Sequence, residues 1–140
     1  MPKNLRRRRN RAGNTMLEST LVFLAFMFLL FGMEEFGRMV FALNFVAEAA
    51  TEGARFASVR SSSCPSPCVP ATQATIQTYV NGWAAGLNTA NITVTPTWPN
   101  GDTPGNSVTV AVTYTWTAAV GKIVPASINF TNSATMLILQ

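Results

Sequence analysis

The residues that could do chemistry in this chain of 140 residues are few and widely separated. Histidine is absent, and the one aspartate, Asp102, lies among turn residues. Glu34 and Glu35 are adjacent, so on a helix they project in different directions and cannot form a carboxylate pair. No glycine-rich phosphate loop and no serine with a neighbouring base is present. The sequence therefore argues against an enzyme and predicts no catalytic residue, cofactor or metal.

The two cysteines, Cys64 and Cys68, lie in a loop rich in serine and proline, residues 61–70. Outside the cytoplasm this close spacing predicts a local disulfide. Its entropic gain should fall below the ~3 kcal/mol estimated for a loop of about 15 residues. Two alternatives stay open: a metal site, which lacks further histidine or cysteine ligands, and a redox pair, which lacks nearby cations to stabilise a thiolate.

Glu18 is the third candidate, because it stands at the start of an apolar run. The 15 residues from Ser19 to Met33 carry no charge and leave no polar face. As a helix, residues 14–33 would rise roughly 30 Å, the thickness of the hydrocarbon core of a bilayer. A helix that is apolar all round is buried in protein or lipid, and the rest of the chain is too small and polar to enclose it. We expect one transmembrane helix over residues 14–33.

The basic residues predict how this helix is oriented. Six of the ten lysines and arginines lie in the first 11 residues, which places the N-terminus in the cytoplasm and the rest across the membrane. Beyond residue 13, four basic residues face six acidic ones, so a nucleic-acid partner is not expected. A secretory signal peptide is the alternative, but no small-residue cleavage site follows Met33.

A carboxylate within such a span is costly, roughly 2.5–3.5 kcal/mol if it lies deep. Glu18 could simply mark the headgroup boundary. However, Gly13 is followed by four uncharged residues and then Glu18, which resembles the processing site of type IV pilins and pseudopilins. The resemblance implies that prepilin peptidase cuts after Gly13 and frees Asn14 as the new N-terminus. It also implies that Glu18 meets the terminal amine of a neighbouring subunit, a pair that can stay in an apolar bundle where neither charge is stable alone.

The helical period continues beyond the span, so we expect one helix from about Met16 to about Val59. Glu34 and Arg38, and Glu52 and Arg55, are spaced to pair on its exposed faces. A seam follows the heptad spacing, and its small outer residues favour close packing against other helices; alternatively, these alanines pack on the chain's own sheet. The seam consists of Phe36, Val40, Leu43, Ala47, Ala50, Ala54 and Ala57.

Two motifs in this helix resemble those of the TadE-like family, small pilin-like proteins of the tight-adherence (Flp) pilus and secretion machinery. The resemblance covers roughly residues 12–60, with Asn14, Thr15 and Glu34 as departures. It implies that Glu18, Glu35 and Arg38 act in assembly, and that the head lies outside the bacterial inner membrane. The partners it implies are prepilin peptidase and other pilin-like subunits. The matching residues are Phe31, Gly32, Glu35, Phe36, Gly37 and Arg38, then Ala50, Glu52, Gly53, Ala54 and Arg55.

Residues 71–140 predict a small α+β head. Apolar residues at helical spacing over residues 71–87 indicate an amphipathic helix, whose Tyr79 and Trp83 belong to the core or, alternatively, bind a ligand. Alternating segments at residues 91–95, 107–116 and 128–139 predict three antiparallel strands. One apolar face of this sheet needs a cover, which the two helices can supply.

The sequence as a whole predicts five segments. They are a basic leader (1–13), the span (14–33), the outer half of the long helix (34–60), the cysteine loop (61–70) and the head (71–140). The most consistent interpretation is a pseudopilin or minor pilin. A major pilin and an uncleaved, membrane-anchored binding module are the alternatives.

Overall fold

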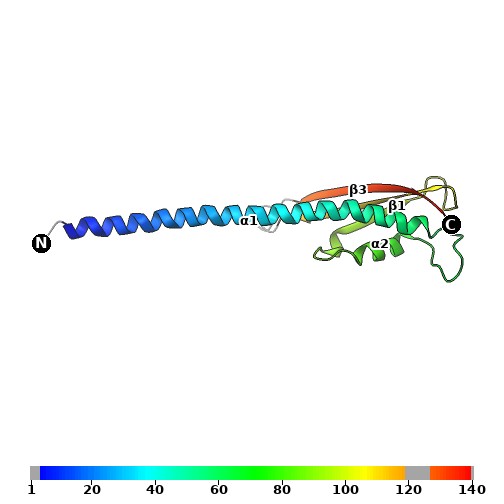
Figure 1. The fold of residues 1–140 in the computed structure, drawn as a ribbon, viewed down its shortest axis with the longest axis horizontal. Coiled ribbons are helices and arrows are strands. Elements are labelled where there is room, and N and C mark those ends of the chain that lie inside the picture. The colour runs from blue at the N-terminus through cyan, green and yellow to red at the C-terminus, as the bar shows by residue number, and fades with distance from the viewer. Residues whose placement is uncertain (1–3, 119–126, 140) are drawn as a thin grey trace. The chain divides into compact units, whose positions relative to one another are not determined.

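The computed structural model describes residues 4–118 and 127–139, with side chains from residue 14 onward. Helix α1 (Asn4–Ser58) is followed by α2 (Gln73–Asn81), a short 3-10 turn η1 (Thr89–Asn91) and three strands, β1 (Ile92–Thr97), β2 (Ser107–Thr117) and β3 (Ser127–Leu137) (Figure 1). The chain forms two compact units, residues 1–38 and 39–140. The expected fold class, a long N-terminal helix with a small α+β head, is confirmed.

In the first unit, α1 contains an 18-residue window with a mean hydropathy of 2.0, of which none is buried. Helix α1 starts earlier than the expected Met16, because leucine, arginine and alanine are strong helix formers and no proline lies between Pro2 and Pro65. Its end at Ser58 agrees with the expected end near Val59.

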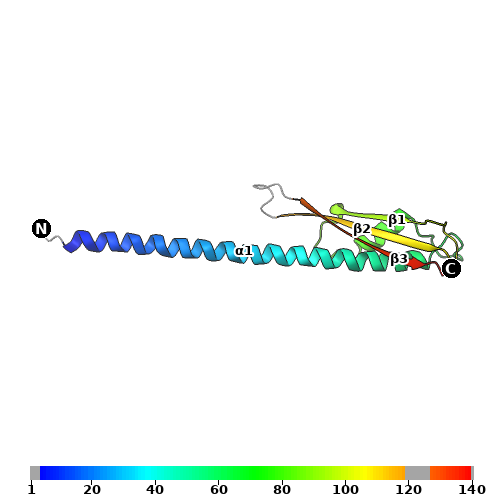
Figure 2. The same ribbon diagram turned by 90° about the horizontal axis from the view of Figure 1, so that it is seen from above.

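The second unit is a two-layer structure. Strands β1, β2 and β3 form one antiparallel sheet in that order, with Val94 opposite Val112 and Val112 opposite Asn132. The outer part of α1 and helix α2 cover one face of the sheet (Figures 1 and 2). Phe130, Ala134 and Met136 of β3 are partly buried against a hydrophobic core that the other elements form. This core includes Ala42, Val46, Ala50, Ala54, Ile76, Val80, Val94, Val108, Val110 and Val112.

The predicted seam of α1 is only partly right. Ala50, Ala54 and Ala57 are almost fully buried, but against the chain's own sheet and α2, so the alternative interpretation holds for them. Phe36, Val40 and Leu43 are exposed, so packing of this part of the seam against other helices stays a prediction, while Ala42, Val46 and Ala49 are also buried in the head. The sheet lies on one side of the helix, and the seam rotates with the helix because the period is 3.6 residues per turn, not 3.5.

Helix α2 is shorter than the expected 71–87. Thr72 caps it through a reciprocal hydrogen-bonded box with Thr75. The helix ends at Asn81, and its C-cap residue is Gly82, because glycine has low helix propensity. Every end of the three strands lies within two residues of the expected end. On β3, however, Ile128 is 44% exposed although it lies on the predicted apolar face.

Loops close the far end of the head. The Ser62 N–H donates to Asp102 Oδ2 at 2.8 Å, and the Ser62 hydroxyl donates to the Asp102 carbonyl at 2.7 Å. Gly105 has φ +90, a conformation that favours glycine, and its N–H donates to the Ile138 carbonyl. The cysteine loop, the β1–β2 loop and the end of β3 are therefore joined by hydrogen bonds.

Candidate assembly site

Glu18 lies on the exposed surface of α1, beside a shallow cleft lined by Thr15, Ser19, Val22, Phe23 and Phe26. Among the residues whose side chains the structure describes, none forms an ion pair with Glu18. The aromatic rings beside it are apolar, so in lipid its carboxylate would need a charged partner from elsewhere.

The hydroxyl groups around Glu18 are satisfied within the helix. The Ser19 hydroxyl donates to the Thr15 carbonyl at 2.9 Å, and the Thr20 hydroxyl donates to the Met16 carbonyl at 2.8 Å. Serine and threonine that bond the preceding turn in this way can enter a bilayer without an unsatisfied donor. Among the described side chains, the Glu18 carboxylate has no such partner within the helix.

The expected processing bond, Gly13–Asn14, lies inside α1, about two and a half turns from its start at Asn4. The peptide bond that a peptidase would cut therefore lies within helical backbone in this structure.

Glu35 and Arg38 form an ion pair in the first unit, with Arg38 Nη1 3.2 Å from Glu35 Oε2. The four-residue spacing suggested that Arg38 pairs with Glu34. This pairing is wrong, because the Arg38 guanidinium contacts Glu35, three residues before it. The Arg38 side chain is about half exposed, so screening by solvent leaves the pair worth roughly 0–1 kcal/mol. Its position is better suited to contacts with other groups than to fold stability.

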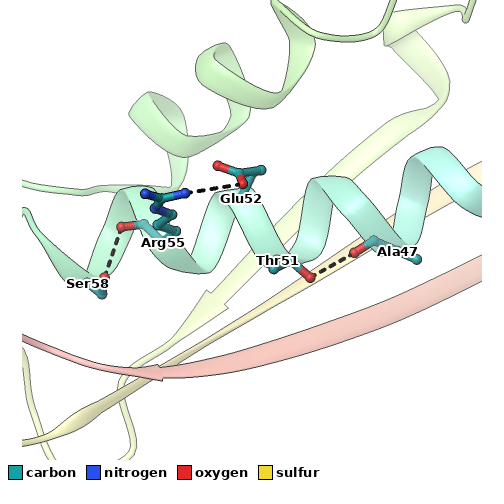
Figure 3. Close-up of polar contacts among 5 residues, drawn as sticks. All are labelled: Ala47, Thr51, Glu52, Arg55 and Ser58. Atoms are coloured by element: carbon teal, nitrogen blue, oxygen red, sulfur yellow. Dashed lines mark hydrogen bonds and ion pairs between the residues drawn. The ribbon is translucent and has the colours of Figure 1, made fainter.

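The second motif divides into an inner and an outer pair. Glu52 and Arg55 pair at 3.8 Å on the outside of α1, as expected (Figure 3). Gly53 and Ala54 face the sheet: Ala54 is fully buried, and a Cβ at Gly53 would lie 3.1 Å from Val110 Cγ1. These two small residues therefore let α1 approach the sheet of its own chain.

The cysteines form the expected disulfide, with the Cys64 and Cys68 Cα atoms 5.8 Å apart. Both sulfur atoms are consumed in this bond, so the metal alternative for this pair is wrong. Tyr79 is partly buried and stacks on Phe56 with 4.4 Å between ring centroids, while Trp83 is half exposed.

A groove of about 200 Å³ between α1 and α2 was not foreseen. Aromatic residues line it, and Glu48 and Glu52 lie at it. The paired spacings of Phe41 with Phe45 and of Tyr79 with Trp83 were a signal for it, because each pair repeats after four residues and so shares a helix face.

Three features of the structure bear on which family the chain resembles. An unpaired acidic residue follows Gly13, an exposed apolar helix carries it, and the second motif packs on a head. Residues 13–55 match the TadE-like family. The match begins at Gly13 and ends at Arg55, and it includes both motifs. No curated protein and no solved structure matches the chain significantly.

The match agrees with the predicted resemblance to the TadE-like family over residues 13–55. It supports a pilin-like role associated with the Tad pilus, and such pilus proteins are structural and not enzymes. The apolar part of the TadE-like helix is long enough to anchor the chain in a membrane. The α2–β3 part of the head lies outside the matched residues.

Proposed function

We propose that this TadE-like chain is a pseudopilin or minor pilin of a Tad/Flp pilus or secretion apparatus, processed by prepilin peptidase after Gly13. The observation that carries the proposal is the position of Glu18: it lies five residues after Gly13, on an exposed apolar helix, within the TadE-like match. The head would lie on the periplasmic side of the inner membrane and could join an extracellular pilus.

The proposed mechanism is mechanical. Cleavage frees the amine of Asn14, and the processed helix stays in lipid until an assembly motor draws it into a bundle. There, Glu18 of one subunit pairs with the new amine of another subunit, because two opposite charges that pair can stay in an apolar setting. Glu35 and Arg38 lie about a bilayer thickness further along α1, where their ion pair can exchange partners with neighbouring subunits.

Two measurements test this proposal. N-terminal sequencing of the protein extracted from membranes should begin at Asn14. Replacement of Glu18 with Ala should leave membrane insertion intact but block assembly, because the amine then has no carboxylate to meet. Glu34→Ala is the matched control: it removes an exposed carboxylate from the same helix and should assemble normally.

A sequence that begins at Met1 would contradict the proposal and favour the uncleaved, membrane-anchored binding module. Normal assembly of the Glu18→Ala protein would show that Glu18 only marks the headgroup boundary.

A further inference from the structure

The two edges of the head's sheet differ, and the β1 edge is closed. Gln77 Nε2 donates to the Ile92 carbonyl at 3.2 Å, and its Oε1 accepts from the Val94 N–H at 2.9 Å. Gln73 Nε2 donates to the Val94 carbonyl at 3.0 Å. The Ile92 N–H donates to the Thr89 carbonyl, and Pro96 has no N–H. The outward N–H groups of β1 are therefore occupied or, at Pro96, absent, and the Ile92 and Val94 carbonyls are occupied as well.

The same hydrogen bonds fix the pattern on β3. In an antiparallel ladder, alternate residues direct both backbone groups toward one neighbour. Val94 directs both groups toward α2, so its partner Val112 bonds β3 through Asn132. The odd-numbered residues of β3 consequently direct their backbone groups away from β2. No further strand lies beyond β3 within the described residues.

Only part of this outer edge is occupied. The Leu139 N–H donates to the Ser58 carbonyl at 2.9 Å, and the Ser133 N–H to Asn132 Oδ1 at 2.8 Å. The N–H groups of Asn129, Thr131 and Thr135 point outward. Proteins usually protect such edges with lysine, proline or a bulge, but residues 127–137 contain no charged residue and no proline.

The apolar face of β3 is also incompletely covered. On β2, Val108, Val110 and Val112 are fully buried. On β3, their neighbours on the same face become more exposed, and Ile128 is 44% exposed while Phe130 and Met136 are only partly buried. An added strand with apolar side chains on this face would cover them.

We propose that the outer edge of β3 takes an extended segment of a different protein chain, uncharged and apolar at alternate positions, as an additional strand of the sheet. Main-chain hydrogen bonds to the odd-numbered residues would hold this segment. Its apolar side chains would pack beside Ile128, Phe130 and Met136.

A second copy of this chain fits the edge poorly. Its own β1 edge is closed, so it can offer only β3. An antiparallel pair of β3 strands would place the outer segments of the two α1 helices in opposite directions, since β3 and this part of α1 run the same way (Figures 1 and 2). The proposed bundle of parallel helices excludes that arrangement, a step that rests on the proposed function. A parallel pair would turn the second sheet over and place its threonine face beside the apolar strip.

The test uses the full chain and a pair of substitutions. Thr131→Pro removes one outward N–H and leaves the β2–β3 ladder in place, as Pro96 does on β1. Thr131→Val is the matched control, because both variants lose the 2.9 Å contact between the Thr131 and Thr113 hydroxyl groups but only valine keeps the N–H. The probe is a synthetic peptide with the sequence of residues 107–117, which is uncharged and alternates apolar residues with threonine; the control peptide carries methyl groups on alternate backbone nitrogens.

We expect hydrogen exchange at the Asn129, Thr131 and Thr135 amides to slow in native membranes and with the peptide, relative to the purified chain alone. The methylated peptide should have no effect. Thr131→Pro should weaken peptide binding roughly tenfold, the effect of about one lost hydrogen bond, and Thr131→Val should not.

Equal exchange at the three amides in native membranes and in the purified chain would overturn the proposal. Equal binding by the proline and valine variants would do the same. Disulfide-linked dimers of a Thr131→Cys variant in native membranes would show instead that a second copy occupies the edge. Because none of these readouts depends on cleavage after Gly13 or on Glu18, failure here leaves the proposed function standing.

Discussion

At the scale of single residues, side chains that are adjacent in one motif do different work. In the motif from Glu52 to Arg55, the charged ends pair outside the helix while Gly53 and Ala54 pack inside. The charged residues of the motif therefore keep one face of α1 polar, while its small residues set how closely the other face approaches the sheet.

Gly53→Leu tests the inner half of the motif. The new side chain would meet Val110 Cγ1, which a Cβ alone would already approach to 3.1 Å, and Val110 is fully buried and cannot move aside. We expect a loss of about 1–3 kcal/mol in the free energy of unfolding of the head, measured by thermal denaturation of the detergent-solubilised chain. Gly37→Leu, with no atom within 4 Å of its Cβ, should not lower stability.

At the scale of elements, α2 both covers the sheet and closes one of its edges. Ile76 and Val80 enter the core, while Gln73 and Gln77 turn to the backbone of β1. From the sequence these glutamines were only the polar face of an amphipathic helix. Their role depends on β1 lying alongside α2, a contact between segments that are distant along the chain.

Gln77→Ala tests this edge closure. The change leaves the Val94 N–H without its acceptor and the Ile92 carbonyl without one donor. We expect the free energy of unfolding to fall by about 1–3 kcal/mol, as measured by denaturant unfolding. The control Thr78→Ala removes an exposed hydroxyl that bonds only its own helix and should change stability by less than about 0.5 kcal/mol. Equal losses in the two variants would contradict a special role for Gln77.

At the scale of the whole molecule, the chain combines an apolar helical segment with a head that has its own core. The basic N-terminal residues and the disulfide both support the proposed orientation, because arginine-rich flanks tend to stay in the cytoplasm and disulfides persist outside it. The two observations are independent, because the first concerns the flank of the apolar segment and the second concerns the cysteine loop.

Protease accessibility tests this orientation. Protease added to intact spheroplasts should digest residues 39–140 and spare the apolar segment, because the bilayer shields the segment and the inner membrane excludes the protease. Immunoblotting with antibodies against the two ends would follow the fragments. Digestion of the head only after the membrane is ruptured would place it in the cytoplasm.

The sequence by itself determined those features that depend on local chemistry. Four of these features depend on neighbouring residues alone: the apolar content of residues 14–33, the period of α1, the alternation in the strands and the close spacing of the cysteines. The long helix, the three-stranded sheet and the disulfide could therefore be predicted. The TadE-like motifs lie in that same helix.

Only the tertiary structure decided which groups meet. It assigned Ala50, Ala54 and Ala57 to the chain's own core, paired Arg38 with Glu35, and used Gln73 and Gln77 to close one edge of the sheet while leaving most of the β3 edge open. Such outcomes depend on the rotation of α1 about its axis and on contacts between distant segments. Sequence periodicity gives the angular position of a buried helix face only approximately. It carries no information on which strand edge another element will cover.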